Sequence, residues 1–130
     1  MAAQPAPAGP AIEVSVAKLR NAKGQLLVCL TSNAKAFPDC SKDPRAIKRA
    51  VPAASGARLT LHVPANGTYA IALVHDENSN DKMDLRLFLP REGFGFSNNP
   101  KIGMGAPGFK SCAFAVTGDR SVAITMKYML

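Results

Sequence analysis

The chain has 130 residues, 47% of them hydrophobic and 19% charged, which fits one globular domain, and no apolar run reaches the roughly 20 residues that cross a bilayer. Sixteen Lys and Arg against nine Asp and Glu give a net charge of +7, which favours anionic partners. Nucleic acid is not expected among them, because the basic residues are scattered and the cluster Lys42, Arg45, Lys48 and Arg49 has no interleaved aromatic residue.

The first segment, MAAQPAPAGPA, is rich in Ala and Pro and carries no charge. Because it cannot bury enough side chain to offset the entropy of ordering, residues 1–11 are predicted to be a flexible tail before a domain over residues 12–130. It lacks the basic start and apolar stretch of a signal peptide. Its composition resembles the start of a mature exported chain, so we expect a periplasmic or secreted location.

Alternating apolar and polar residues predict strands in six runs: IEVSVAKL (12–19), GQLLVCLTS (24–32), RLTLHV (58–63), TYAIALVH (68–75), CAFAV (112–116) and SVAITMKYML (121–130). Short Gly- or Asn-containing segments separate several of them, namely RNAKG, PANG and TGDR, and these are predicted to form tight turns, the first two as hairpins. An all-β domain is therefore expected, built as a single antiparallel β-sandwich.

Two long connections interrupt this pattern, at residues 33–56 and 76–110. The first contains DPRAIKRAV, in which Asp43 is suited to a helix N-cap and Pro44 to the first helical position. This pattern favours a short helix near residues 43–50. The second connection is too long for a plain loop in a compact domain, which marks either a functional segment or further structure.

The three cysteines match no paired-cysteine metal pattern. Cys29 lies in a predicted strand and Cys40 follows a short loop, so a disulfide between them is one interpretation in an oxidising compartment. Cys112 would then be the remaining thiol. The other interpretation is three buried, unreactive thiols.

The segment HDENSNDKMD, which follows a predicted strand, places Asp76, Asn78, Asn80 and Asp84 at positions 1, 3, 5 and 9 of a loop. Ca²⁺ binds six to eight oxygen ligands, and alternating Asp and Asn can direct their side chains to one centre. The backbone carbonyl of Lys82, at position 7, would supply another ligand. The spacing therefore predicts a calcium site that imitates the first nine positions of an EF-hand loop.

The segment departs from that loop at two positions. Asp81 stands where Gly is usual, and Leu87 stands where a bidentate Glu is usual, so Glu92 is the nearest source of the missing carboxylate. The alternative is a metal-free structural turn whose Asp and Asn side chains bond to their own backbone. In that case the domain would bind an anionic or carbohydrate partner by another surface.

The continuation GFGFSNNP offers a second candidate site. Phe94, Phe96, Asn98 and Asn99 either line a groove for a sugar or peptide, or the two rings complete the core and the asparagines form a turn. Catalysis has little support, because the sequence lacks a nucleophile elbow and a phosphate-binding glycine loop. A nucleophilic pair of Cys112 with His62 or His75 would require the fold to bring them together.

With VHDENSNDKMD, LPREGFGFSNNP, APGFKSCAF and the final KYML in this order, the chain resembles the bacterial DUF2141 family, a domain of unknown function. The resemblance extends back through GQLLVCLTS and FPDCSKDP. It implies a small exported β-sandwich of transthyretin-like or immunoglobulin-like kind, and it implies no activity. Our prediction is a non-enzymatic exported module of unknown role, with calcium as the candidate ion at residues 76–84.

Overall fold

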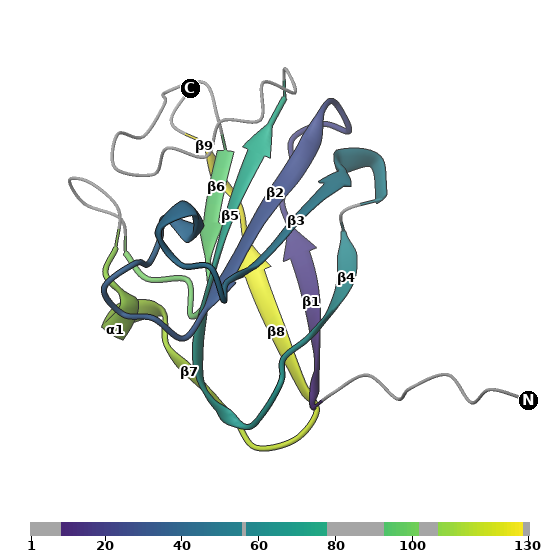
Figure 1. The fold of residues 1–130 in the computed structure, drawn as a ribbon. Coiled ribbons are helices and arrows are strands. Elements are labelled where there is room, and N and C mark those ends of the chain that lie inside the picture. The colour runs from purple at the N-terminus through teal and green to yellow at the C-terminus, as the bar shows by residue number, and fades with distance from the viewer. Residues whose placement is uncertain (1–8, 56, 78–92, 102–106, 129–130) are drawn as a thin grey trace, which may run out of the picture.

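The computed structural model describes residues 9–55, 57–77, 93–101 and 107–128, and these form two β-sheets packed as an open sandwich (Figure 1). The three-stranded sheet has the order β4-β1-β8, with β1 at Ala11–Ala17, β4 at Arg58–His62 and β8 at Arg120–Thr125. The six-stranded sheet has the order β3-β2-β5-β6-β9, and β7 also pairs with β5. Its strands are β2 (Gln25–Thr31), β3 (Ile47–Pro52), β5 (Gly67–Asp76), β6 (Gly93–Phe96), β7 (Phe114–Val116) and β9 (Lys127–Tyr128). The predicted β-sandwich is confirmed.

The helical structure is short. It consists of the helix α1 (Phe109–Cys112) and two 3-10 turns, at Cys40–Lys42 and Ala53–Ser55. In the part of the chain that the structure describes, no helix is long and apolar enough to span a membrane.

The main core lies between the two sheets and follows the alternation that the sequence shows. In β1, Ile12, Val14 and Val16 are buried while the residues between them are exposed. The same core takes alternate residues from the other long strands, including Leu26, Val28, Leu30, Tyr69, Ile71, Leu73, Val122, Ile124 and Met126. Burial of such side chains is worth about 1.5–3 kcal/mol each. The period-two pattern therefore explains why the two sheets pack face to face.

A second apolar cluster, hereafter the outer apolar cluster, covers the opposite face of the six-stranded sheet. Loop 32–46 and α1 lie over this face (Figure 1) and contribute Phe37, Cys40 and Phe109 to it. They pack on the other set of alternate residues, namely Leu27, Cys29, Ala70, Ala72, Val74, Phe94 and Phe96, with Cys112. Strands β2 and β5 are therefore buried on both faces, which explains why their sequences are continuously apolar.

Two predicted hairpins and one predicted strand direction are wrong. The segment between β1 and β2 and the segment between β4 and β5 are not hairpins, because β1 pairs with β4 and β8 while β5 pairs with β2, β6 and β7. The sandwich is also not wholly antiparallel, since β1 and β8 are parallel. Hydrophobic periodicity reports which residues are buried, and it does not report which strand lies beside which.

The predicted helix near residues 43–50 is also wrong, because residues 47–52 form β3. Asp43 accepts a hydrogen bond from the backbone N–H of Arg45, as an N-cap would, but its other carboxylate oxygen accepts from the Thr31 hydroxyl at 2.5 Å. Strand β3 follows and pairs with β2 along its whole length. Six ladder positions beside a buried strand outweigh the weak helical preference of this short segment.

The crossing from β4 to β5 is closed by a tyrosine. The Tyr69 hydroxyl donates to the carbonyl oxygen of Ala65, four residues earlier, at 2.8 Å. A tyrosine that bonds back in this way at a corner between sheets occurs in immunoglobulin-like sandwiches. The bond holds the PANG segment as a corner between layers.

Candidate functional site

The predicted calcium loop begins at the last residue of β5. Asp76 is fully buried, is paired in register with Gln25 of β2, and accepts a hydrogen bond from the Gln25 side-chain amide at 3.0 Å. Gly24 lies against the backbone of residues 76 and 77 with a φ of +65°, where any side chain would overlap it. The first candidate ligand is therefore held in one position by the neighbouring strand.

The remaining predicted ligands lie outside the described residues. These are Asn78, Asn80, Lys82, Asp84 and Glu92, together with Asp81. Among the residues that the structure describes, no group of three or more His, Cys, Asp or Glu side chains converges in a way that could hold a metal ion. Calcium at this loop therefore stays a prediction.

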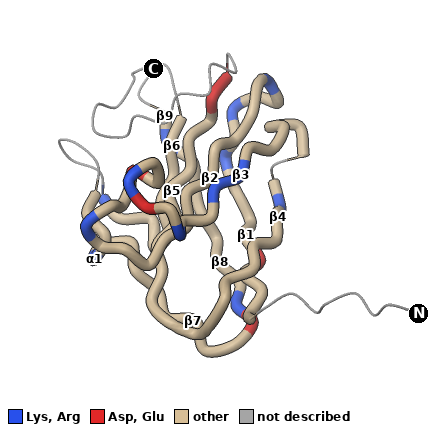
Figure 2. The backbone as a smooth tube through the Cα atoms, viewed as in Figure 1, with Lys and Arg blue, Asp and Glu red and all other residues tan. Residues whose placement is uncertain are grey.

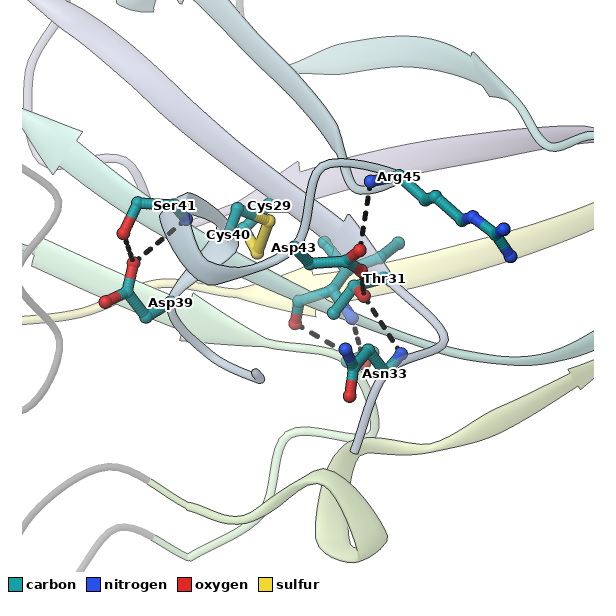
Figure 3. Close-up of a disulfide and its surroundings, with 10 residues drawn as sticks. Cys29, Thr31, Asn33, Asp39, Cys40, Ser41, Asp43 and Arg45 are labelled. Atoms are coloured by element: carbon teal, nitrogen blue, oxygen red, sulfur yellow. Dashed lines mark hydrogen bonds between the residues drawn. A yellow bond between two sulfur atoms is a disulfide. The ribbon is translucent and has the colours of Figure 1, made fainter. Parts of the chain in front are cut away.

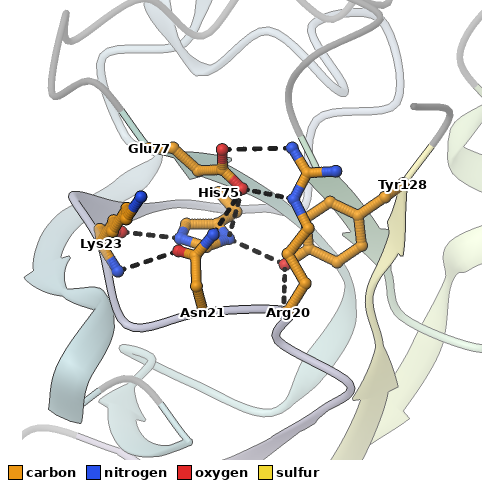
Figure 4. A network of polar contacts seen from close by, with 6 residues as sticks. All are labelled: Arg20, Asn21, Lys23, His75, Glu77 and Tyr128. Atoms are coloured by element: carbon orange, nitrogen blue, oxygen red, sulfur yellow. Dashed lines mark hydrogen bonds and ion pairs between the residues drawn. The ribbon is translucent and has the colours of Figure 1, made fainter.

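Glu77 follows Asp76 and is bound by the segment between β1 and β2 (Figure 4). Arg20 donates to both of its carboxylate oxygens, at 2.6 and 3.1 Å, and the Asn21 amide donates at 3.2 Å. The hydrogen bond and charge of Arg20 lower the pKa of Glu77, and Glu77 in turn raises that of Arg20. This bidentate pair secures the start of the acidic segment to the connection between β1 and β2.

His75 lies behind this pair and is fully buried (Figure 4). Its Nε2 lies 2.8 Å from the Lys23 carbonyl oxygen, which can only accept, so Nε2 carries a proton. Its Nδ1 lies 2.8 Å from the Tyr128 hydroxyl. Burial raises the pKa of Tyr128, so the phenol stays protonated. The same Nδ1 lies 3.9 Å from a carboxylate oxygen of Glu77. The Tyr128 oxygen also accepts from the backbone N–H of Arg20, at 3.2 Å.

Stacking completes the cluster formed by Arg20, Glu77, His75 and Tyr128, hereafter the polar cluster. The Arg20 guanidinium lies 4.5 Å from the centre of the Tyr128 ring, a cation–π contact. On the other side the ring lies against Gly93, where a methyl group would overlap it. The polar cluster thus joins the loop after β1, the end of β5 and the last described strand, β9.

The structure joins Cys29 and Cys40 by a disulfide, the pairing that the sequence suggested (Figure 3). It ties loop 32–46 to the central strand β2. Nearby, Asp39 accepts from both the backbone N–H and the hydroxyl of Ser41. Cys112 is a free, fully buried thiol, and burial raises its pKa to about 11.

The residues of the second candidate site are buried in the core or hydrogen-bonded to the backbone of other segments. Phe94 and Phe96 are 2% exposed and belong to the outer apolar cluster. The Asn98 amide donates to the Ala113 carbonyl at 2.6 Å. The Asn99 side chain accepts from the Thr125 N–H at 2.8 Å and donates to the Ala123 carbonyl at 3.3 Å. Both asparagines have positive φ, which Asn tolerates better than most residues.

Sequence reasoning missed Arg20, Tyr128 and Ser97. The first two belong to the polar cluster but lie 108 residues apart. Ser97 is fully buried, and its hydroxyl accepts from the Ile71 N–H at 2.9 Å and donates to the Cys112 carbonyl at 2.5 Å. No local pattern marks any of the three, because each acquires its partners only when distant strands are brought together.

The geometry defines the class of protein as a two-sheet β-sandwich with a disulfide-bound covering loop and a polar cluster at one end. A family profile described as an uncharacterized protein conserved in bacteria, DUF2141, matches residues 14–125. The chain therefore belongs to the DUF2141 family, as the resemblance implied. The search of curated proteins finds no match, and neither does the search of solved structures.

Proposed function

We propose that this domain is an exported, non-enzymatic binding module whose loop after β5 binds Ca²⁺. The observation that carries the proposal is the placement of Asp76, whose carboxylate is fully buried and oriented by Gln25 where the acidic segment begins. The oxygen-bearing side chains Asn78, Asn80 and Asp84 follow it at calcium-like spacing. A first ligand fixed by a strand reduces the entropy that ordering the loop around an ion would cost.

The described chemistry supports binding in preference to catalysis. Cys112 carries a raised pKa, so its thiol is protonated at neutral pH and is a weak nucleophile. Both ring nitrogens of His75 are bonded, to Tyr128 and to Lys23. His62 is exposed on the outer side of β4, in the other sheet from the cluster that holds Cys112.

Export is supported by the disulfide. Disulfides form and persist in oxidising compartments such as the periplasm, and they are rare in the reducing cytosol. The Cys29–Cys40 bond holds loop 32–46 over the outer apolar cluster, so the compartment in which the protein folds would affect its stability.

Calcium titration followed by thermal unfolding tests the proposal. An ion that binds only the native state must raise the melting temperature, and Ca²⁺ should do so more than Mg²⁺. Asp84→Ala should abolish the shift, and Asp76→Asn should reduce it. The matched control is Glu13→Gln, which neutralises an exposed carboxylate on β1. An unchanged melting temperature at millimolar Ca²⁺ would refute the calcium site.

A further inference from the structure

Strand β3 forms one edge of the six-stranded sheet (Figure 1) and, among the described residues, pairs with β2 alone. The Ala53 N–H donates to the Gly24 carbonyl at 3.0 Å, next to the pair Gln25–Pro52. In an antiparallel ladder, hydrogen-bonded pairs alternate with pairs that are not bonded. Residues 47, 49 and 51 therefore bond to β2, whereas Lys48, Ala50 and Pro52 direct their backbone groups outward.

The position of the proline agrees with this assignment. Pro52 has no N–H, and at an edge the missing donor faces away from the ladder. Its carbonyl accepts from the Ser55 hydroxyl at 3.3 Å, and the Lys48 carbonyl accepts from the Arg49 guanidinium at 3.2 Å. The N–H groups of Lys48 and Ala50 and the carbonyl of Ala50 remain as the outward groups without a partner among the described residues.

This edge is strongly basic. Lys42, Arg45, Lys48 and Arg49 are all exposed, and Figure 2 shows basic segments on β3 and on the loop before it. The two carboxylates of the same region face local partners, since Asp39 bonds to Ser41, and Asp43, 7% exposed, bonds to Thr31 and Arg45. None of the four cations forms an ion pair with a described carboxylate.

The edges of the three-stranded sheet differ in this respect. Arg58 is the single cation of β4, and Arg120 is the single cation of β8. Arg120 is engaged internally, because it donates to the Ala115 carbonyl and lies over the Phe114 ring. Of the edge strands β3, β4 and β8, β3 is the one that combines outward backbone groups with several exposed cations on the strand and on the loop before it.

We propose that an acidic, extended peptide segment of a partner protein binds by adding a strand to the edge of β3. The outward groups of Lys48 and Ala50 would bond to the backbone of the added strand, and the four cations would pair with its carboxylates. Like charges disfavour the same edge pairing with itself in a second copy, so the basic residues select an acidic partner and prevent self-association. The disulfide and Phe37 hold the loop that carries Lys42 and Arg45 against the sheet.

Fluorescence anisotropy with a labelled ten-residue peptide of alternating Glu and Val tests this proposal. Binding should weaken with salt, and a Lys–Val peptide of the same length should not bind. The double variant Lys48→Glu/Arg49→Glu should weaken binding by about tenfold or more, a loss of roughly 1.4 kcal/mol or more. The matched control, Arg58→Glu on β4, should leave the affinity unchanged.

Ala50→Pro separates strand addition from simple charge attraction. It removes one outward N–H while the bonds of residues 49 and 51 to β2 are kept, so it should abolish peptide binding but not binding of dextran sulfate, a flexible polyanion. Equal peptide affinity for Ala50→Pro and the parent protein would overturn the proposal in favour of a polyanion surface. No binding of the Glu–Val peptide at low salt would also overturn it.

Amide hydrogen exchange provides a test that does not depend on a variant folding. On addition of the Glu–Val peptide to the parent protein, exchange at the Lys48 and Ala50 amides should slow, because these amides gain hydrogen bonds. The amides of residues 47, 49 and 51 are already bonded to β2 and should change little. Unchanged exchange at Lys48 and Ala50 with bound peptide would show that the peptide binds elsewhere.

Discussion

The imidazole Nδ1 of His75 and the hydroxyl of Tyr128 lie 2.8 Å apart, although 53 residues separate them in the chain. This bond links the end of β5, where the acidic segment starts, to β9 near the C-terminus. The same hydroxyl accepts from the Arg20 N–H, so three distant segments meet at one oxygen atom. The stability of this end of the sandwich should therefore depend on that atom.

Tyr128→Phe removes the hydroxyl and leaves the ring in place. It should destabilise the protein by about 1–3 kcal/mol, because Nδ1 of a fully buried His75 loses its hydrogen-bond partner. Urea unfolding at pH 7 measures the change. His62→Gln, at an exposed histidine on β4, is the control and should stay within about 0.5 kcal/mol of the parent protein. Equal stability of Tyr128→Phe and parent would contradict the role of the bond.

The Arg20–Glu77 pair should make stability depend on pH. Because its pKa is lowered in the folded state, chiefly by the Arg20 hydrogen bond, Glu77 contributes stability that is present above the unfolded-state value of about 4.3. That contribution is lost as the pH falls through the lower folded-state pKa. Unfolding of parent and Glu77→Gln from pH 7 to pH 3 should show a difference that shrinks below about pH 4.

Arg20→Ala provides the control for this prediction. In that background the main cause of the lowered pKa is absent, so Glu77→Gln should produce a smaller difference at pH 7 and a weaker pH dependence. A difference that grows as the pH falls would contradict the sign of the effect.

The disulfide should contribute measurably to stability. The two cysteines are 11 residues apart, and closing a loop of this size is worth about 3 kcal/mol in the chain-entropy model. Cys29→Ser/Cys40→Ser should therefore unfold at a lower urea concentration than the parent protein. Dithiothreitol should destabilise the parent and leave the double variant unchanged, which separates reduction of the bond from other effects.

Thiol reactivity gives an independent measurement on the same cysteines. Native protein should react slowly, since Cys112 is fully buried and its pKa is raised to about 11. After denaturation without reductant, one thiol per chain should react. Three reactive thiols in protein prepared under oxidising conditions would exclude the Cys29–Cys40 bond.

Asn99 should contribute to the free energy of unfolding. Asn99→Ala removes the bonds to Thr125 and Ala123 and places Ala at a φ of 44°, so we expect a loss of about 1–3 kcal/mol in urea unfolding. Asn99→Gly relieves the backbone strain but not the lost bonds, so it should lie between Ala and the parent protein. If the Asn99→Gly variant proves less stable than the Asn99→Ala variant, the positive φ is not the constraint that we describe.

Several features of the fold follow from local sequence. The alternation of Ile12, Val14 and Val16 identifies the buried side of β1, and the continuously apolar β2 and β5 indicate strands covered on both faces. The PANG segment shows where local prediction fails, since its Asn-Gly pair predicts a hairpin whereas the chain crosses to the other sheet there. A turn signal specifies a change of direction, and the choice of neighbour depends on the packing of both layers.

The sequence by itself determined the fold class, the buried faces of the strands and the family resemblance, and it offered the Cys29–Cys40 bond as one of two interpretations that the structure decided. Tertiary structure alone decided that residues 47–52 are an edge strand, and that Arg20, His75, Glu77 and Tyr128 form one cluster. Within HDENSNDKMD, spacing marked Asp76 as a candidate ligand, and the fold alone decided that its carboxylate is buried and bonded to Gln25. Burial and local spacing are encoded in neighbouring residues, whereas hydrogen bonds between residues 51 to 108 positions apart exist only after the sheets have packed.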